Sequence, residues 1–489
     1  MHPPTDTLPR RAPVLVGVGT ADSSCPVTEL MARATVAAAA DAGSPTLLGA
    51  VERIAIPQGT WTHTDPARAL ARHIGAPTAR TFLYEIGVSQ QEMIDEVLAA
   101  IGRGDIEVAL VVGGEARAYA RRGGAEDEGT SEPPDVTITR PPDFIAPIES
   151  AAGIVWPVVQ QYALIENALA AHEQRSPEAH LAEVAALWAR FNQVARGNPR
   201  AAFPTPRSPA FIATPSAENR PLAYPYNLWH SSQWTVDQAA ALLFCSAGRA
   251  AAAGVPKDRW VFPRVALHAS QAITLTARAN LFEWPAMQVL GRAAAAHLGV
   301  PLREIEIAEV YSCFPAAVRV QQRSLQLDVD ATPTLTGGMT FAGGPFNNYV
   351  LQATAAVVPR LRAEPGQLGL VSTVSGMLSK PGLAVWSCTP PPSAQRALLA
   401  DLDADAAAAT ATRAVATPEL AAGPATVVSY TVTYDADDRL RPARTAIVAD
   451  RADGSRAAAA CEDESFARAA LGESPIGQTV HLQSTSFTP

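Results

Sequence analysis

The sequence predicts an α/β protein with more than one buried core. Its 489 residues are 48% apolar and 17% charged, which is typical of a globular chain of two or more domains. Apolar residues recur with helical spacing over 89–102, and the short apolar run 108–112 follows at once. A strand, a helix and a strand joined by short links form a βαβ unit with parallel strands. The same order of elements returns in the second half of the chain.

The first half alternates expected strands and helices around one long insertion. Strands are expected at 13–20, 54–56, 81–84, 108–112 and 236–244, and helices at 27–42 and 89–102. Residues 119–225 differ, because two proline-rich stretches there flank two helical patterns over 163–195. We therefore expect a core formed by 1–118 and 226–260, interrupted by a loop domain at 119–225.

The second half repeats this outline and then changes character. Strands are expected at 261–268, 304–310, 368–373 and 382–387, with helices at 284–298 and 350–358. This order predicts a duplicated α/β core, with 261–394 as its second half. The alanine- and aspartate-rich stretch 398–416 predicts a linker helix within 395–416. Residues 417–489 alternate short strands with one helix, which is typical of a small five-stranded barrel.

Charge and cysteine content exclude several classes of function. A net charge of -9 argues against nucleic acid as the main partner, because phosphate binding requires a basic face. Five scattered cysteines show no metal-ligand spacing and suggest a reducing compartment. No apolar run is long enough to span a membrane, and the N-terminus lacks a signal-peptide pattern. We expect a cytoplasmic protein with no metal site and no covalently bound cofactor.

Two motifs in the second half of the chain contain the candidate functional residues. Tyr311, Ser312, Cys313 and Phe314 come directly after an expected strand, and α/β proteins commonly place their sites at the carboxyl ends of strands. Four glycines between Gly337 and Gly344 then precede an expected helix, whose start offers N–H groups to an anion. A surface turn followed by a core helix is the alternative interpretation of this second motif.

Both motifs resemble segments of thiolases. Glu309-Val310-Tyr311-Ser312-Cys313-Phe314 is similar to the EVHDCF segment of sterol-carrier-protein thiolases, and the run from Gly337 to Pro345 is similar to the thiolase GGxxxxGHP block. The resemblance extends over most of the chain and is closest to actinobacterial thiolase-like proteins of type 1, often labelled acetyl-CoA acetyltransferases. It implies the thiolase fold, with a duplicated βαβ core in five αβαβα layers, a C-terminal OB-like barrel, and CoA or an acyl-CoA as ligand.

The working groups of thiolases are replaced in this chain. The resemblance places the cysteine nucleophile at Gly87, the histidine base at Gly344, the second cysteine at Thr373, and the Asn or His that holds the enolate oxygen at Tyr311. The hydroxyl nearest to the nucleophile position is that of Ser89, which is either a nucleophile or a helix cap. We therefore expect that ordinary thiolase chemistry is lost and that the scaffold for the pantetheine arm is kept.

Three functions compete. The first is a CoA- or acyl-CoA-binding protein without thiolase activity, whose pocket is formed by Val88, Ser89, Cys313, Phe314, Gly343, Asn347, Ser375 and Gly376. The second is a C–C lyase that cleaves β-hydroxyacyl-CoA by a retro-aldol reaction with Tyr311 and Tyr349, although a tyrosine with its ordinary pKa near 10 is a poor base. In the alternative interpretation, Tyr349 packs in the core. The third is an acetyl-CoA acyltransferase, which the missing residues disfavour. For Cys313 we expect packing rather than catalysis, and we leave monomer and homodimer open.

Overall fold

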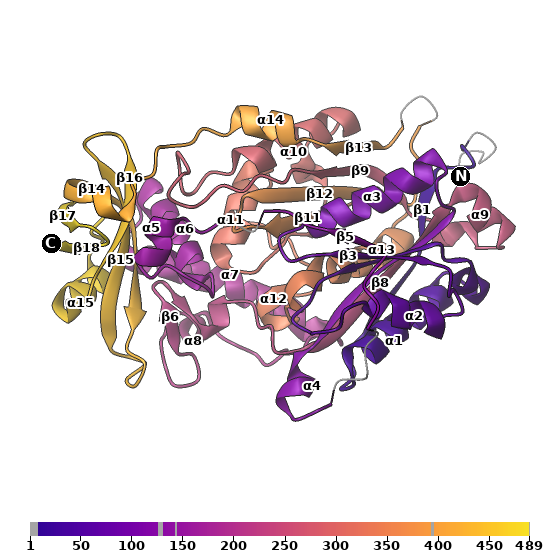
Figure 1. Ribbon diagram of the computed structural model, residues 1–489, viewed down its shortest axis with the longest axis horizontal. Coiled ribbons are helices and arrows are strands. Elements are labelled where there is room, and N and C mark those ends of the chain that lie inside the picture. The colour runs from indigo at the N-terminus through magenta and orange to yellow at the C-terminus, as the bar shows by residue number, and fades with distance from the viewer. Residues whose placement is uncertain (1–7, 126–130, 142–143, 393–395, 489) are drawn as a thin grey trace.

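A computed structural model describes residues 8–125, 131–141, 144–392 and 396–488. It contains two large sheets with helices between and outside them, and a small barrel at one end of the molecule (Figure 1). No helix in the described residues is long and apolar enough to cross a membrane.

The first sheet has six strands, five of them from the predicted first core. Their order is β1 (Pro13–Ala21), β8 (Asp237–Ser246), β4 (Val108–Ala116), β2 (Arg53–Pro57), β3 (Arg80–Tyr84) and β5 (Val136–Ile138). β2 runs parallel to both β3 and β4, as predicted for the βαβ unit. Val108, Leu110 and Val112 pack on one face and Ala109 and Val111 on the other, so the uninterrupted apolar run 108–112 reflects burial of both faces.

The second sheet has five strands from the second core. Their order is β10 (Ile307–Glu309), β11 (Leu368–Ser375), β12 (Lys380–Ser387), β9 (Phe262–His268) and β13 (Leu398–Asp401). Helices α3 (Gln90–Arg103) and α13 (Tyr349–Ala363) lie between the two sheets and contact both (Figure 1). Helices α1 (Val27–Asp41) and α2 (Pro66–His73) cover the outer face of the first sheet, and α10 (Pro285–Leu298) that of the second, with α11 (Pro315–Ser324) beside it. These are the five expected layers.

Two glycines in β1 allow α1 to pack closely on the first sheet. A Cβ at Gly17 would lie 2.0 Å from the main-chain oxygen of Ala38, and one at Gly19 would lie 2.1 Å from that of Ala34. Any side chain at either position would push the helix off the sheet.

Most regular elements of the insertion between β4 and β8 are helices. It contains α4 (Arg117–Arg121), α5 (Pro147–Ala151), α6 (Val159–His172), α7 (Pro177–Gly197), α8 (Pro209–Ala213) and the short hairpin β6 (Pro221–Ala223) and β7 (Tyr226–Asn227). The two helical patterns predicted over 163–195 are α6 and α7. The insertion also supplies β5, which pairs with β3 at the edge of the first sheet.

The linker helix predicted for 398–416 is wrong over most of its length. Leu398–Asp401 is strand β13, which runs parallel to β9, and only Asp403–Ala409 (α14) is helical. The remaining stretch is extended, with isolated bridges from Thr412 to Arg278 and from Val415 to Arg456. The edge of β9 offers backbone hydrogen bonds to this segment, and these outweigh the helix propensity of its leading leucines and alanine.

Residues 422–488 close into the five-stranded barrel that the sequence predicts. Its strands follow the order β14 (Ala422–Tyr434), β15 (Pro442–Arg451), β16 (Arg456–Cys461), β18 (Ser486–Thr488) and β17 (Thr479–Gln483), with α15 (Glu464–Gly472) packed on β15. The barrel lies against α5 and α6 of the insertion (Figure 1). The main chains meet there, since the N–H of Tyr224 donates to the oxygen of Val432 at 2.9 Å.

Candidate functional site

The first motif is held by β11 and α11. The N–H of Tyr311 donates to Ser372 Oγ at 3.0 Å, and Gln321 Nε2 donates to the oxygen of Tyr311 at 2.8 Å. Ser372 Oγ donates in turn to Gln321 Oε1 at 2.6 Å. Because both backbone groups of Tyr311 are bound by buried side chains, the place of this residue at the end of β10 is fixed.

The two candidate tyrosines lie in contact. The rings of Tyr311 and Tyr349 meet edge to face, with centroids 5.7 Å apart. The hydroxyl of Tyr349 donates to Glu309 Oε1 at 2.7 Å and lies 2.8 Å from Thr336 Oγ1. The structure thus brings Tyr311 and Tyr349 together, and it directs the proton of Tyr349 to a carboxylate.

Neither tyrosine has the properties of a general base. Burial raises the pKa of both Tyr311 and Tyr349, and the Glu309 carboxylate raises that of Tyr349 further. Glu309 also accepts the backbone N–H groups of Leu335 and Thr336 at 2.6 and 2.9 Å. Tyr349 therefore holds the glycine block against β10, while a protonated Tyr311 can act only as a hydrogen-bond donor or an acid.

The glycine block leaves no room for the histidine of thiolases. A Cβ at Gly344 would lie 1.9 Å from Ser232 Oγ, and one at Gly343, where φ is +107°, would lie 2.5 Å from Gln238 Oε1. The N–H of Ser232 donates to the oxygen of Cys313 at 2.9 Å. Ser232 therefore fills the space beside Gly344, where the resemblance places the base, and links the two motifs.

A lysine lies at the nucleophile position. Gly87 has a φ of +107°, and a Cβ built there would lie 3.7 Å from Lys380 Nζ. Lys380 Nζ donates to the main-chain oxygens of Gly87 at 2.7 Å and Pro141 at 3.0 Å. The lysine is fully buried, and burial lowers its pKa. It ties the loop before α3 to the chain that follows β5. The sequence analysis missed this residue, although the chain has only one other lysine, Lys257, and a lysine in an apolar strand was a usable signal.

Two buried hydroxyls at the thiolase positions are unpaired. Ser89 occupies the N-cap position of α3, as its interpretation as a helix cap predicts, but its hydroxyl makes no capping hydrogen bond. Ser89 Oγ and Thr373 Oγ1 are fully buried, and neither has a hydrogen-bond partner among the described residues. Gln91 lies against the same strands, since a Cβ at Gly382 would be 2.4 Å from its Cβ and 2.9 Å from that of Thr373. Unused polar atoms thus gather where α3 faces β11 and β12.

One backbone N–H group at the start of α13, that of Val350, is already bonded to a side chain, whereas free N–H groups were expected after the glycines. Gln90 Oε1 accepts the N–H of Val350 at 2.8 Å. Asn347 Nδ2 donates to the oxygen of Gln58 at 3.1 Å, and Asn347 Oδ1 accepts from Gln90 at 3.4 Å. Asn347 and Gln90 thus join the starts of α13 and α3, and the Val350 N–H is taken up by this contact.

Cys313 and Phe314 belong to an aromatic cluster. Phe314 stacks between Tyr162 and Tyr226, at centroid distances of 4.6 and 5.4 Å. Burial raises the pKa of Cys313 to about 12, although a hydrogen bond with Tyr162 opposes the rise. At neutral pH Cys313 is therefore a thiol, in keeping with a packing role.

The other expected pocket residues lie near Lys380. Val88 is buried beside Ser89. Ser375 pairs with Lys380 across the β11–β12 hairpin, and Gly376 is in its turn with a φ of +59°. Among the residues described, no group of three or more His, Cys, Asp or Glu side chains could hold a metal ion.

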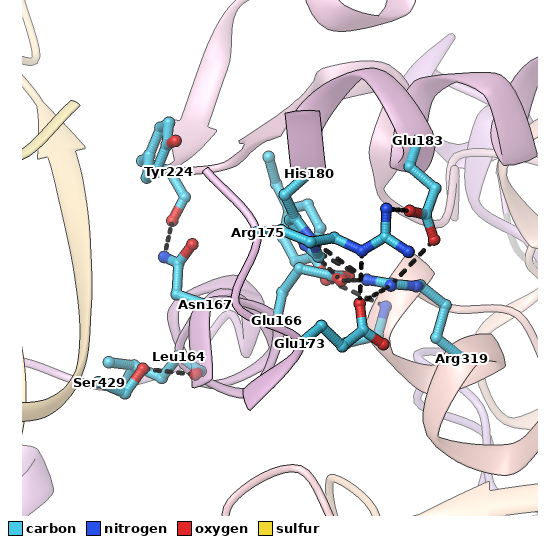
Figure 2. A network of polar contacts seen from close by, with 12 residues as sticks. Leu164, Glu166, Asn167, Glu173, Arg175, His180, Glu183, Tyr224, Arg319 and Ser429 are labelled. Atoms are coloured by element: carbon cyan, nitrogen blue, oxygen red, sulfur yellow. Dashed lines mark hydrogen bonds and ion pairs between the residues drawn. The ribbon is translucent and has the colours of Figure 1, made fainter. Parts of the chain in front are cut away.

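A separate network of charges locks the insertion onto the helix that follows the first motif (Figure 2). Arg319 of α11 donates to Glu166 at 2.6 Å, Glu173 at 2.8 Å and Glu183 at 3.2 Å. Glu166 also pairs with His180 at 2.9 Å. Burial alone would raise the pKa of Glu166, but Arg319, His180 and Tyr226 together hold it at about 2. This network orders α6 and α7 beside Tyr311 and Cys313.

The layers, the two central helices and the paired motifs together define a protein of thiolase fold. Along its whole length the chain is similar to the monomeric SCP2-thiolase-like protein type 1 of Mycobacterium smegmatis, with 29% identity, a TM-score of 0.82, and coverage of 98% of this chain and 99% of that one. The resemblance drawn from the sequence is thereby confirmed.

More distant structures share only the core. The Ltp2–ChsH2(DUF35) aldolase matches 77% of this chain and 98% of its own at 18% identity, with a TM-score of 0.58. The dimeric peroxisomal thiolase of Saccharomyces cerevisiae matches 78% of this chain and 98% of its own at 14% identity, with a TM-score of 0.53. At these identities the likeness concerns the fold alone. No family model and no curated protein matches the sequence.

Proposed function

We propose that this protein binds CoA or an acyl-CoA at the start of α3 and does not carry out the thiolase reaction. The observation that carries the proposal is the pair of fully buried hydroxyls, Ser89 and Thr373, which lack partners among the described residues. A buried hydroxyl without a partner costs about 1–3 kcal/mol. The carbonyl oxygen of a thioester would accept hydrogen bonds from these groups and remove that cost.

Three features argue against thiolase chemistry. Gly87 carries no nucleophile, and Ser232 fills the space of the base at Gly344. The nearby cysteine, Cys313, has its pKa raised to about 12 by burial, so it is not a thiolate at neutral pH. Hydrogen-bond donors remain, and these suffice for binding.

Calorimetric titration with CoA, acetyl-CoA and acetoacetyl-CoA tests this proposal. We expect the thioesters to bind and acetoacetyl-CoA plus CoA to give no thiolysis above the uncatalysed rate. Thr373→Val should weaken thioester binding by about tenfold, because one hydrogen bond to the ligand is lost.

Thr445→Val is the matched control, because Thr445 Oγ1 in the barrel is also buried and without a partner among the described residues. Equal affinities of Thr373→Val, Thr445→Val and the unaltered protein would contradict the proposed site. A measurable rate of thiolysis would contradict the loss of thiolase activity.

Retro-aldol cleavage of a β-hydroxyacyl-CoA is the second candidate. The contact between Tyr311 and Tyr349 supports the acid half of this reaction, because a protonated Tyr311 can donate a proton to the enolate. The raised pKa values leave neither tyrosine able to take the proton of the β-hydroxyl, so that step needs another base. CoA release from a β-hydroxyacyl-CoA substrate, with Tyr311→Phe as the variant, is the assay. Activity that survives Tyr311→Phe would exclude this role.

We further propose that the chain is a monomer in solution. The similar protein from M. smegmatis is described as monomeric and matches this chain over its whole length, barrel included. Light scattering should give a mass near 51.3 kDa.

A further inference from the structure

A buried arginine without a carboxylate partner lies in the segment between β9 and α10. Arg278 is 5% exposed, and its Nη2 donates to the main-chain oxygen of Met377. Its Nη1 has no hydrogen-bond partner, and no acidic side chain of the described residues pairs with it. Burial lowers the pKa of Arg278 to about 10, and the buried Glu149 carboxylate opposes this from beyond hydrogen-bond distance. The unpaired Nη1 therefore remains available to a hydrogen-bond acceptor.

A cavity of about 160 Å³ lies beside Arg278. Trp284 also lines it, is 2% exposed, and has an indole Nε1 with no partner among the described residues. Gln271 lines the same cavity and is anchored by a 3.1 Å bond from Nε2 to the oxygen of Asp403. Two unused donors of different residue types thus occur at one cavity. One acceptor, Gln271 Oε1, is also buried without a partner among the described residues, and the exposed Glu283 lines the cavity as well. The two donors indicate a ligand that offers acceptors to Arg278 and Trp284.

The barrel and the linker fix the position of Arg278. Its main chain bridges to Thr412, and its oxygen accepts from Arg456 Nη1 of β16 at 2.5 Å. The next residue, Ala279, donates from its N–H to the oxygen of Ala411 at 3.3 Å. The C-terminal domain therefore holds a binding group of the core in place, and such preorganisation reduces the cost of binding.

The cavity adjoins the candidate site. Leu378 and Ser379 of the β11–β12 turn line it, and Arg278 Nη2 donates to the oxygen of Met377 in the same turn. Ser379 Oγ donates at 2.7 Å to the oxygen of Gly376, one of the expected pocket residues.

We propose that this cavity binds a carboxylate group through Arg278 and Trp284. The planar fork of a guanidinium matches the two oxygens of a carboxylate, and a cavity of this size suits a short chain. The carboxylate belongs either to a free short-chain acid or to the far end of an acyl chain carried as a thioester. The second source rests on the proposed CoA binding, whereas the first does not.

Calorimetric titration with glutarate at constant ionic strength is the first experiment, and glutaramide, which is neutral and of similar shape, is the comparison ligand. We expect glutarate to bind and glutaramide to bind at least about tenfold more weakly, because hydrogen bonds to charged groups are worth about 1.5–3 kcal/mol. Equal affinity for the two ligands would overturn the proposal. So would the absence of any heat of binding at a glutarate concentration of about 10 mM.

Variants assign the binding to these residues. Arg278→Gln should weaken glutarate binding by about tenfold or more, and Trp284→Phe by about threefold, since one neutral hydrogen bond is lost. Arg292→Gln, which removes the same charge from the exposed side of α10, should leave it unchanged. If Arg278→Gln does not fold, Trp284→Phe decides, and unchanged affinity in Trp284→Phe would overturn the proposal.

A second pair of titrations separates the two sources. Glutaryl-CoA that binds more tightly than butyryl-CoA, with the difference abolished in Arg278→Gln, would assign the cavity to the end of an acyl chain. Glutarate binding without any such difference would assign it to a free acid. If neither thioester binds while glutarate does, the proposed CoA function fails and the carboxylate site stands.

Discussion

Two buried polar regions of this molecule contrast in how far their groups are paired. In the network that joins the insertion to α11, both carboxylate oxygens of Glu166 are bonded, one to Arg319 and the other to Tyr226 at 2.7 Å. At the start of α3, the hydroxyls of Ser89 and Thr373 are equally buried and have no partner among the described residues. The first arrangement is what structural stability requires, whereas the second costs stability and is suited to binding.

Of the changes predicted here, removal of Arg319 should lower the free energy of unfolding most. Arg319→Met leaves the buried Glu166 without its cation, and Glu173 and Glu183 lose a donor. We expect the free energy of unfolding to fall by about 3–5 kcal/mol, the usual result of breaking a buried ion pair. Urea denaturation measures this change. A loss below about 1 kcal/mol would mean that the network behaves like an exposed set of ion pairs.

Acid should weaken the same network through Glu166. The pKa of this group is about 2 in the folded protein and near 4.5 ordinarily, so its contribution is fully present above pH 4.5 and is lost as the pH falls toward 2. The shift corresponds to about 3 kcal/mol. Glu166→Gln should flatten the pH dependence of stability across this window, as measured by denaturation at several pH values. A slope identical to that of the unaltered protein would contradict the assignment.

The two lysines of the chain should differ in how much each contributes to the stability of the fold. Lys380→Met removes the donors from the oxygens of Gly87 and Pro141, so we expect a loss of about 2 kcal/mol. Lys257 is exposed and lies over the ring of Trp260, so Lys257→Met should cost at most about 1 kcal/mol. Thermal denaturation of both variants compares them. Equal effects would show that Lys380 does not hold the loop before α3.

The smallest predicted effect tests by its sign whether the hydroxyl of Thr373 is unpaired, in comparison with a paired hydroxyl of the barrel. Thr373→Val removes an unpaired hydroxyl and should raise the free energy of unfolding by about 1 kcal/mol. Thr431→Val removes a hydroxyl that donates to the oxygen of Tyr224 at 2.9 Å and should lower it by about 1 kcal/mol. Both threonines are fully buried, so the pair is matched in burial. Two changes of the same sign would remove the basis for the comparison.

Helices and strands with a clear apolar period were predictable from the sequence, and strands without such a period were not. The helix over 89–102 and the strand at 108–112 were predictable because burial imposes a period on the sequence. Strand β16 reads Arg-Ala-Ala-Ala-Ala-Cys, whose alanines favour helix, and β13 lies in a similar stretch. Both strands form because a neighbouring strand edge is open to them, and that is a tertiary condition.

In the candidate site, too, some residues were predictable from the sequence and others were not. The contact of Tyr311 with Tyr349 was predictable, because each follows a motif whose place in the fold the resemblance fixes. Ser232, Lys380 and Arg278 were not, because each reaches the site from a distant part of the chain and carries no local signature. For Lys380, the scarcity of lysine was the one available signal.

The sequence by itself determined the order of strands and helices, because hydrophobic periodicity is a property of the chain alone, and its resemblance to thiolases indicated the fold and the positions to inspect. Only the tertiary structure decided what became of the vacated positions. Ser232 lies where a side chain at Gly344 would begin, Lys380 bonds to the oxygen of Gly87, and Thr373 has a hydroxyl without a partner among the described residues. The physical reason is that pairing of a buried polar group depends on which side chains packing brings within about 3 Å of it, and sequence spacing does not encode that distance.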